Sequence, residues 1–131
     1  MKPYLSVVIP AFNEEHLVIN SLAAVDHYLA KQPYPSEIVV VIDGSTDRTL
    51  EVVREFAVGK EHIRWIARPQ NRGKGYSVRE GMLAAKGQIR LFTDADNSTD
   101  ISHFDSMQRR MPAIAFFPWL ALTAGALMWN C

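Results

Sequence analysis

The sequence predicts an α/β protein with a doubly wound, mostly parallel sheet. Short apolar runs alternate with amphipathic helical patterns over the first 110 residues. These runs are rich in β-branched residues and lack polar alternation, as strands buried on both faces do. The resulting order, β-α-β-α-β-α-β, implies parallel strands joined by right-handed crossovers.

The first strand and helix are predicted near the amino terminus. Leu5–Ile9 is a short apolar run that Pro10 is expected to stop. A helix is predicted to start at Asn13, because Asn is a common capping residue and the acids Glu14 and Glu15 suit the positive end of the helix dipole. Its buried face has 4-3-4 spacing and consists of Val18, Leu22, Val25 and Leu29.

The second strand–helix unit repeats this pattern. Glu37–Ile42 is almost entirely β-branched and predicts the second strand. In the turn after it, Ser45 and Asp47 are expected to cap the following helix. The buried face of that helix is predicted to hold Leu50, Val53 and Ala57. Ile63–Ile66 is the predicted third strand.

The last unit contains a basic, glycine-rich loop at Asn71–Gly75 and the fourth strand at Gln88–Thr93. Gly87 is expected to end the helix between them, whose buried face would hold Val78, Met82 and Ala85. Ligands of such sheets bind beyond the carboxyl ends of the strands. Four loops are expected at that edge: Pro10–Glu15, Asp43–Asp47, Arg68–Gly75 and Asp94–Asp96.

Length and composition narrow the function classes. The 131 residues suffice for one domain with a real core, and 48% of them are hydrophobic, which is too apolar for disorder. Fourteen basic residues balance fourteen acidic ones, so electrostatic binding to nucleic acid is not expected. The single cysteine, Cys131, excludes a disulfide framework and a cysteine-based zinc cluster. Because no charged region followed by an apolar one opens the sequence, a secretory signal is not expected.

The acidic pair Asp94 and Asp96 directly follows the fourth predicted strand. Residues two apart in an extended segment point the same way, so both carboxylates would face one spot. A hard divalent cation, Mg²⁺ or Mn²⁺, relieves their repulsion and suits carboxylate oxygens together with a substrate diphosphate. A solvated acidic turn or a helix cap is the alternative, but the place of the pair after an apolar strand favours the metal site.

Asp43 and Lys74 are two further candidates at the same edge. Asp43 follows a buried strand, and its carboxylate accepts hydrogen bonds only, as needed to bind the imide N–H of a uracil ring. The alternative is that it caps the next helix. Lys74 lies between two glycines beside the suspected anion site. Neither the dinucleotide-binding nor the P-loop pattern is present, because Val78 and Gly75 stand at positions that those motifs reserve for other residues.

Four segments together resemble glycosyltransferase family 2: Val7–Glu15, Asp43–Asp47, Asn71–Gly75 and Asp94–Asp96. The resemblance covers about residues 4–107, and the stretch from Asn71 to Asp96 looks most like the dolichyl-phosphate β-glucosyltransferase branch. It implies the nucleotide-binding half of a GT-A fold and inverting transfer of glucose from UDP-glucose to a polyprenyl or dolichyl phosphate. A GDP-mannose donor and a non-catalytic, truncated or membrane-tethered fragment are the alternatives.

The resemblance also implies roles for individual residues. The nucleotide pocket would be lined by Pro10, Ala11 and Glu14, with Asp43 at the uracil and Lys74 near the base or phosphates. Asp94 would face the ribose or sugar, and Asp96 would hold the divalent metal at the diphosphate; these two acids are the predicted catalytic residues. The implied partners are a nucleotide-sugar donor, a lipid-phosphate acceptor and a membrane surface, with the protein at its cytoplasmic face.

The charge distribution divides the chain into residues 1–110, the glycosyltransferase-like region, and residues 111–131. The second range contains no Lys, Arg, Asp or Glu, and too little chain follows Asp96 for an acceptor half, so a truncated domain is expected. The preferred interpretation of residues 111–131 is a non-native reading frame. A membrane segment flanked by Arg109 and Arg110 comes second, and packed core comes third.

Overall fold

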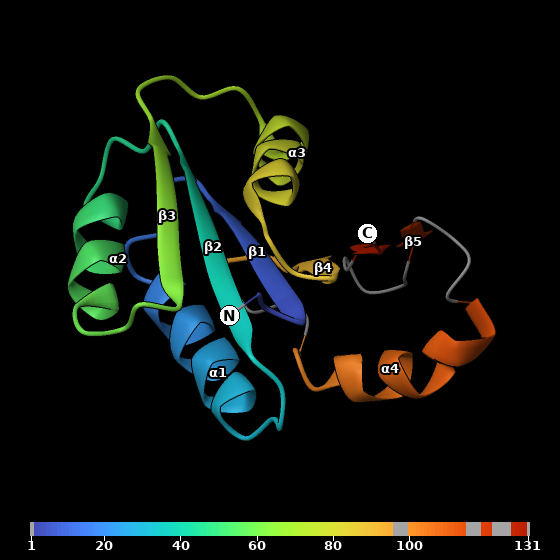
Figure 1. Cartoon of the computed structure of the whole chain (residues 1–131). Coiled ribbons are helices and arrows are strands. Elements are labelled where there is room, and N and C mark those ends of the chain that lie inside the picture. Colours follow the sequence, from blue (N-terminus) through green and yellow to red (C-terminus); the bar gives the residue numbers. More distant parts are fainter. Residues whose placement is uncertain (1, 96–99, 115–118, 122–126, 131) are drawn as a thin grey trace.

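The computed structural model describes residues 2–95, 100–114, 119–121 and 127–130, with side chains described as far as residue 109. It contains one sheet in the strand order β3-β2-β1-β4-β6-β5 (Figure 1). The parallel strands are β1 (Leu5–Ala11), β2 (Ser36–Asp43), β3 (Ile63–Arg68) and β4 (Ile89–Phe92). The helices are α1 (Val18–Ala30), α2 (Thr49–Ala57), α3 (Lys74–Ala84) and α4 (His103–Ile114).

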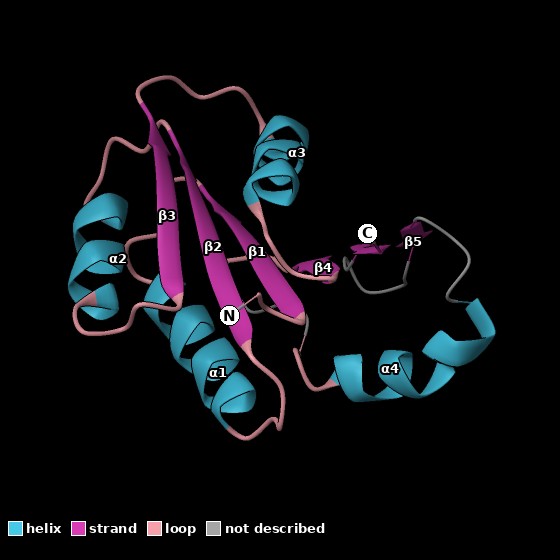
Figure 2. Cartoon of the chain, in the orientation of Figure 1, coloured by secondary structure: helices cyan, strands magenta, loops and turns pink. Residues whose placement is uncertain are grey.

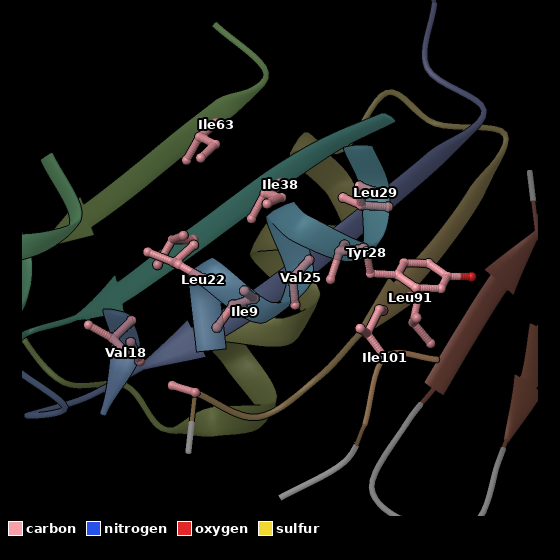
Figure 3. Packing of buried hydrophobic residues seen from close by; sticks show 14 of the residues in the cluster. Ile9, Val18, Leu22, Val25, Tyr28, Leu29, Ile38, Ile63, Leu91 and Ile101 are labelled. Carbon is pink, nitrogen blue, oxygen red and sulfur yellow. The ribbon is translucent and has the colours of Figure 1, made fainter. Parts of the chain in front are cut away.

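Helices cover both faces of the sheet (Figure 2). On one face, α1 and α2 pack over the strands, and the four predicted α1 residues from Val18 to Leu29 are all buried there (Figure 3). Ile9 and Ile38 belong to the same cluster, as does Phe104 of α4, which is fully buried. This arrangement confirms the predicted doubly wound α/β fold.

Helix α3 covers the opposite face. Met82 and Ala85 from this segment pack with the strand residues Val8, Val39 and Val41. Neighbouring residues of a strand point to opposite faces of the sheet. Because helices cover both faces, every residue of β1 is buried, which explains why the apolar runs lack polar alternation.

The uncharged tail enters the sheet as β5 (Trp119–Ala121) and β6 (Leu127–Asn130), with β6 antiparallel to both β4 and β5. Within the described ranges, no helix combines the length and apolar character needed to cross a membrane. The three interpretations of residues 111–131 stay predictions.

Pro10 does not stop the first strand, contrary to the expectation. It lies inside β1, opposite Val41 of β2. The carbonyl of Val8 accepts a hydrogen bond from Thr93 on the β4 side, and backbone groups two residues apart on a strand face the same way. The nitrogen of Pro10 therefore faces the β4 side beyond Phe92, where β4 has ended. The pairing of β1 with β4 ends at Val8 and Phe92, so Pro10 lies beyond the paired part of that ladder, where proline is tolerated.

The prediction that the first helix starts at Asn13 is also wrong. α1 begins at Val18, and Asn13 adopts a positive φ of 50° that interrupts any helix. Asparagine tolerates this conformation better than most residues. Its side chain Oδ1 accepts a hydrogen bond from the Thr46 N–H at 2.8 Å, and its own N–H donates to Ser45 Oγ at 3.0 Å. Asn13 thus joins two loops, and Ser45 binds that loop where a helix cap was expected.

The boundaries of α3 differ from the prediction as well. Lys74 and Gly75 form its first turn, where a loop was expected, and the helix ends at Ala84, three residues before Gly87. Gly87 has a different role. A Cβ there would lie 2.5 Å from Ser6 Oγ, and the Gly87 N–H donates to that oxygen at 2.8 Å. Glycine therefore allows the backbone to approach β1.

A buried carboxylate secures the amino-terminal end of β2. Glu37 accepts hydrogen bonds from Ser6 Oγ and the Lys86 N–H, each at 2.6 Å, and pairs with Arg64. Arg64 also donates to the carbonyl of Ala84, the last residue of α3. Burial alone would raise the pKa of Glu37, but these hydrogen bonds and the Arg64 charge hold it below the ordinary value of 4.5.

We expect this group to contribute to acid denaturation. Because the pKa of Glu37 is lowered on folding, its stabilisation is complete above pH 4.5 and is lost as the pH falls through the folded-state pKa. Glu37→Gln should lower the free energy of unfolding at pH 7 by about 1–3 kcal/mol. Its stability should then fall less steeply with acid than that of the parent. Urea denaturation at several pH values measures both effects. If the free energy of unfolding fell equally steeply with acid in the two proteins, the assignment would be contradicted.

Candidate functional site

A pocket of about 390 Å³ lies at the carboxyl ends of the parallel strands. The ends of β1 and β2, the start of α3 and the loops that follow β1, β3 and β4 contribute to it. The lining residues are Pro10, Ala11, Phe12, Glu14, Asp43, Asn71, Gly73, Lys74, Ser77, Asp94 and Ala95. Six predicted site residues, namely Pro10, Ala11, Glu14, Asp43, Lys74 and Asp94, therefore share one pocket. Asp96, the seventh, lies outside the described residues.

The loop that follows β1 is held by side chains from the loop that follows β2 and from the first residue of α2. The N–H of Glu14 donates to Thr49 Oγ1 at 2.9 Å, and that of Glu15 donates to Asp47 Oδ2 at 3.2 Å. Asp47 also accepts the N–H of Thr49, the first residue of α2, in keeping with its predicted capping role. These contacts place Glu14 at the pocket wall. Glu14 lies in a loop there and not in the first turn of a helix, where it was expected.

Asp43 is a buried anion surrounded by donors of its own chain. Oδ1 accepts hydrogen bonds from Arg68 at 2.5 Å and from the Arg72 N–H at 2.9 Å, and Oδ2 accepts the Gly73 N–H at 2.9 Å. Burial by itself would raise the pKa of Asp43, but these donors stabilise the anion and hold the pKa below its ordinary value. The side chain stays charged at neutral pH.

Arg68 is a central residue of the site that sequence reasoning missed. Its guanidinium donates to Asp43, to Ser77 Oγ at 2.6 Å and to Glu80 at 2.7 Å, and it lies over the Tyr76 ring. Asp43 and Arg68 end neighbouring parallel strands and are directly opposite in register. The predicted strands Glu37–Ile42 and Ile63–Ile66 do not give this register when either end is aligned, so the pairing follows only from the structure.

Gly44 allows the loop after β3 to approach Asp43. It has a φ of 68°, which favours glycine, and a Cβ there would lie 2.4 Å from the nitrogen of Asn71 and 2.6 Å from the carbonyl carbon of Gln70. The backbone immediately after β2 and the backbone of this loop are therefore in close contact. That proximity lets Asp43 accept the Arg72 and Gly73 N–H groups and brings Asn71 into the pocket wall.

The acidic turn after β4 is fixed by two contacts. Asp94, with a half-buried side chain, forms an ion pair with Lys74 from the first turn of α3. Ser21 of α1 donates a hydrogen bond to the carbonyl of Ala95 at 2.5 Å. Asp94 and Lys74 therefore face the same pocket, which supplies both an anionic and a cationic group for a charged ligand.

The donor set of this edge fits a divalent cation in part. The carboxylate of Asp94 provides hard oxygen ligands at the pocket wall. No cluster of three or more metal-ligating side chains occurs among the described residues, and Asp96 lies outside them. A cation held by one or two carboxylates, with substrate phosphates completing its shell, requires no such cluster.

A family model described as "Glycosyl transferase family 2" matches residues 6–114. The chain belongs to glycosyltransferase family 2. The resemblance expected from the four motifs is thereby confirmed. Family 2 relatives include a dolichyl-phosphate beta-glucosyltransferase from Trichomonas vaginalis, 40% identical over 113 residues, and one from Saccharomyces cerevisiae, 41% identical over 119 residues. The alignments cover 82% and 86% of this chain but only 35% and 34% of the relatives, so the chain spans about a third of their length.

Solved structures agree with a GT-A glycosyltransferase 2 fold. TarS from S. aureus, in complex with UDP-GlcNAc, superimposes with a TM-score of 0.67 at 29% identity, covering 84% of this chain and 31% of that one. The mannosyltransferase PcManGT from Pyrobaculum calidifontis, in complex with GDP-Man and Mn²⁺, gives a TM-score of 0.72, covering 99% and 45%. At 21% identity the second match concerns the fold alone.

Proposed function

We propose that this chain forms the nucleotide-sugar-binding part of an enzyme that transfers glucose from UDP-glucose to a dolichyl or other polyprenyl phosphate. The observation that carries the proposal is the convergence of Asp43, Lys74 and Asp94 on one pocket. The names of the relatives, dolichyl-phosphate beta-glucosyltransferases, support the acceptor class. The enzyme would work at the cytoplasmic face of a membrane, where its lipid acceptor is accessible.

In this proposal the uracil ring lies near Asp43. Oδ2 of Asp43 accepts a hydrogen bond from the Gly73 N–H, and a carboxylate oxygen has two lone pairs. The imide N–H of uracil would donate to the second. Asn71 would enclose the base and ribose together with Pro10 and Ala11, at the carboxyl end of β1.

The diphosphate would lie between Lys74 and the acidic turn. Asp96 would hold Mg²⁺ or Mn²⁺, with Asp94 beside it at the ribose or sugar, and the metal would neutralise negative charge on the leaving group. An oxygen of the acceptor phosphate attacks the anomeric carbon, the bond from that carbon to the diphosphate breaks, and its electron pair leaves with UDP. Attack opposite the leaving group inverts the anomeric centre. A phosphate acceptor is already ionised at neutral pH and needs no strong general base.

Calorimetric titration with UDP tests the donor site. We expect UDP to bind in the presence of Mn²⁺ and to bind at least about tenfold more weakly when EDTA replaces the metal, a loss of about 1.4 kcal/mol. Asp96→Asn should remove most of the metal dependence while leaving the fold intact. ADP should bind more weakly than UDP, because adenine has no ring N–H to donate to the Asp43 carboxylate. Guanine has such an N–H, so GDP binding as tight as that of UDP would favour the alternative GDP-mannose donor.

Glu61→Gln is the matched control, since Glu61 is an exposed carboxylate remote from the pocket residues in sequence. It should bind UDP as the parent does. Absence of UDP binding by the folded parent would contradict the proposal and would favour a non-catalytic fragment.

A further inference from the structure

Arg68 connects the end of β2 with helix α3 through its guanidinium group. Nη2 donates to Asp43 Oδ1 at 2.5 Å and to Ser77 Oγ at 2.6 Å, and Nη1 donates to Glu80 Oε1 at 2.7 Å. The Nε–H is buried and has no acceptor among the described residues. Ser77 and Glu80 lie three residues apart on one face of α3. The two terminal nitrogens therefore hold the guanidinium, and α3 supplies an acceptor to each of them.

The Arg68 side chain has little freedom to move. It is only 10% exposed, and its Cζ atom lies 4.9 Å from the centroid of the Tyr76 ring. Its bonds to the carboxylates of Asp43 and Glu80 are charge-assisted, which makes them stronger than bonds between neutral groups. Because a guanidinium presents its N–H groups in fixed directions, its contacts with α3 determine how it approaches Asp43.

This contact makes the two carboxylate oxygens of Asp43 unequal. Oδ1 accepts hydrogen bonds from Arg68 and from the Arg72 N–H, which occupy both of its lone pairs. Oδ2 accepts the Gly73 N–H and keeps one lone pair for a ligand. The torsion that rotates a carboxylate is soft, so the position of these oxygens depends on their donors. Without Arg68, Oδ1 would also have a free lone pair, and one contact that opposes rotation would be lost.

We infer that Arg68 is a positioning residue for recognition of the base. Anchored on Ser77 and Glu80, it orients the Asp43 carboxylate so that Oδ2 receives the imide N–H of uracil. The inference rests on the proposed function, and it adds residues that determine the specificity for the base through Asp43.

A comparison of UDP with N3-methyl-UDP, each in the presence of Mn²⁺, tests this role. The two ligands differ only at the imide nitrogen, so the ratio of their dissociation constants reports the contact with Asp43. The parent should bind UDP at least about tenfold more tightly, and Arg68→Met should reduce this preference to less than about threefold. Partial unfolding weakens both ligands by the same factor and leaves the ratio unchanged. The ratio therefore separates positioning from a loss of stability.

Glu80→Ala tests the anchor on α3 with less risk to the fold, because the Glu80 side chain is 32% exposed. It removes the acceptor of Nη1 and should lower the preference for UDP about threefold. Glu80→Gln should retain the parental preference, because its amide oxygen accepts the same hydrogen bond. Glu55→Ala is the matched control. Glu55 pairs with Arg48 in an exposed ion pair and is not among the described residues that line the pocket, so this variant should behave as the parent does.

The outcomes distinguish this inference from the proposed function. If the parent prefers UDP and Arg68→Met keeps that preference, the positioning role is overturned and the proposed function stands. Equal losses of preference in Glu80→Ala and Glu55→Ala would also overturn the role. If the parent binds both ligands equally well, uracil does not contact Asp43 and the role of Arg68 fails, although the donor site stands. If the folded parent binds neither ligand, both proposals are overturned.

Discussion

Asp43→Ala is expected to cause the largest loss of stability of any single substitution in the candidate site. The change leaves the Arg68 guanidinium, which is about nine-tenths buried, without its main counter-ion, and it leaves the Arg72 and Gly73 N–H groups without their acceptor. Removing one partner of a buried ion pair costs about 3–5 kcal/mol. Urea denaturation followed by circular dichroism at pH 7 measures this loss.

A double-mutant cycle separates the ion pair from the other contacts of Asp43. Arg68→Met removes the buried charge, so the combined loss in Asp43→Ala/Arg68→Met should be smaller than the sum of the two single losses by about 1–3 kcal/mol. If the stability losses of the two single variants added up to that of the double variant, the two side chains would stabilise the fold independently. That result would contradict the ion pair between them.

Gly81→Ala should cause the second large loss of stability, because α3 lies so close to the sheet that a methyl group does not fit. A Cβ at Gly81 would lie 2.3 Å from Val8 Cγ1 and 3.0 Å from Val41 Cγ2. The helix would have to lift from β1 and β2, and such overpacking costs about 1–3 kcal/mol. Thermal and urea denaturation measure the change.

The same helix provides the matched control. Gly75 lies in the first turn of α3, and a Cβ there meets nothing within 4 Å. Gly75→Ala should therefore raise the free energy of unfolding by up to about 1 kcal/mol, because alanine favours the helix over glycine. If both variants changed stability in the same direction and by the same amount, the close packing at Gly81 would not be the cause.

Much of this fold follows from hydrophobic pattern alone. Four apolar runs and the 4-3-4 spacing from Val18 to Leu29 predict the four parallel strands and the buried face of α1. The rule that ligands bind at the carboxyl ends of strands then predicts which loops converge. Six of the seven candidate residues lie together in one pocket for this reason, although their individual roles stay predictions.

The remaining details depend on tertiary contacts that local patterns do not encode. Asn13 looks like a helix cap, yet its partners Ser45 and Thr46 lie in another loop. Pro10 is accepted in β1 because its neighbour β4 ends early. Arg68 reads as an ordinary polar residue at the end of a strand, and only its register opposite Asp43 gives it a buried partner.

The two buried carboxylates of β2 have a consequence for how the chain selects one alignment of its strands. The apolar run between Glu37 and Asp43 is nearly uniform, so a shift of β3 along β2 by two residues would keep the same faces buried at little hydrophobic cost. Arg64 and Arg68 of β3 pair with Glu37 and Asp43 at opposite ends of that run. A shifted alignment would leave the buried Glu37, Asp43 and Arg68 without their partners, so charge, more than hydrophobicity, defines the position of β3.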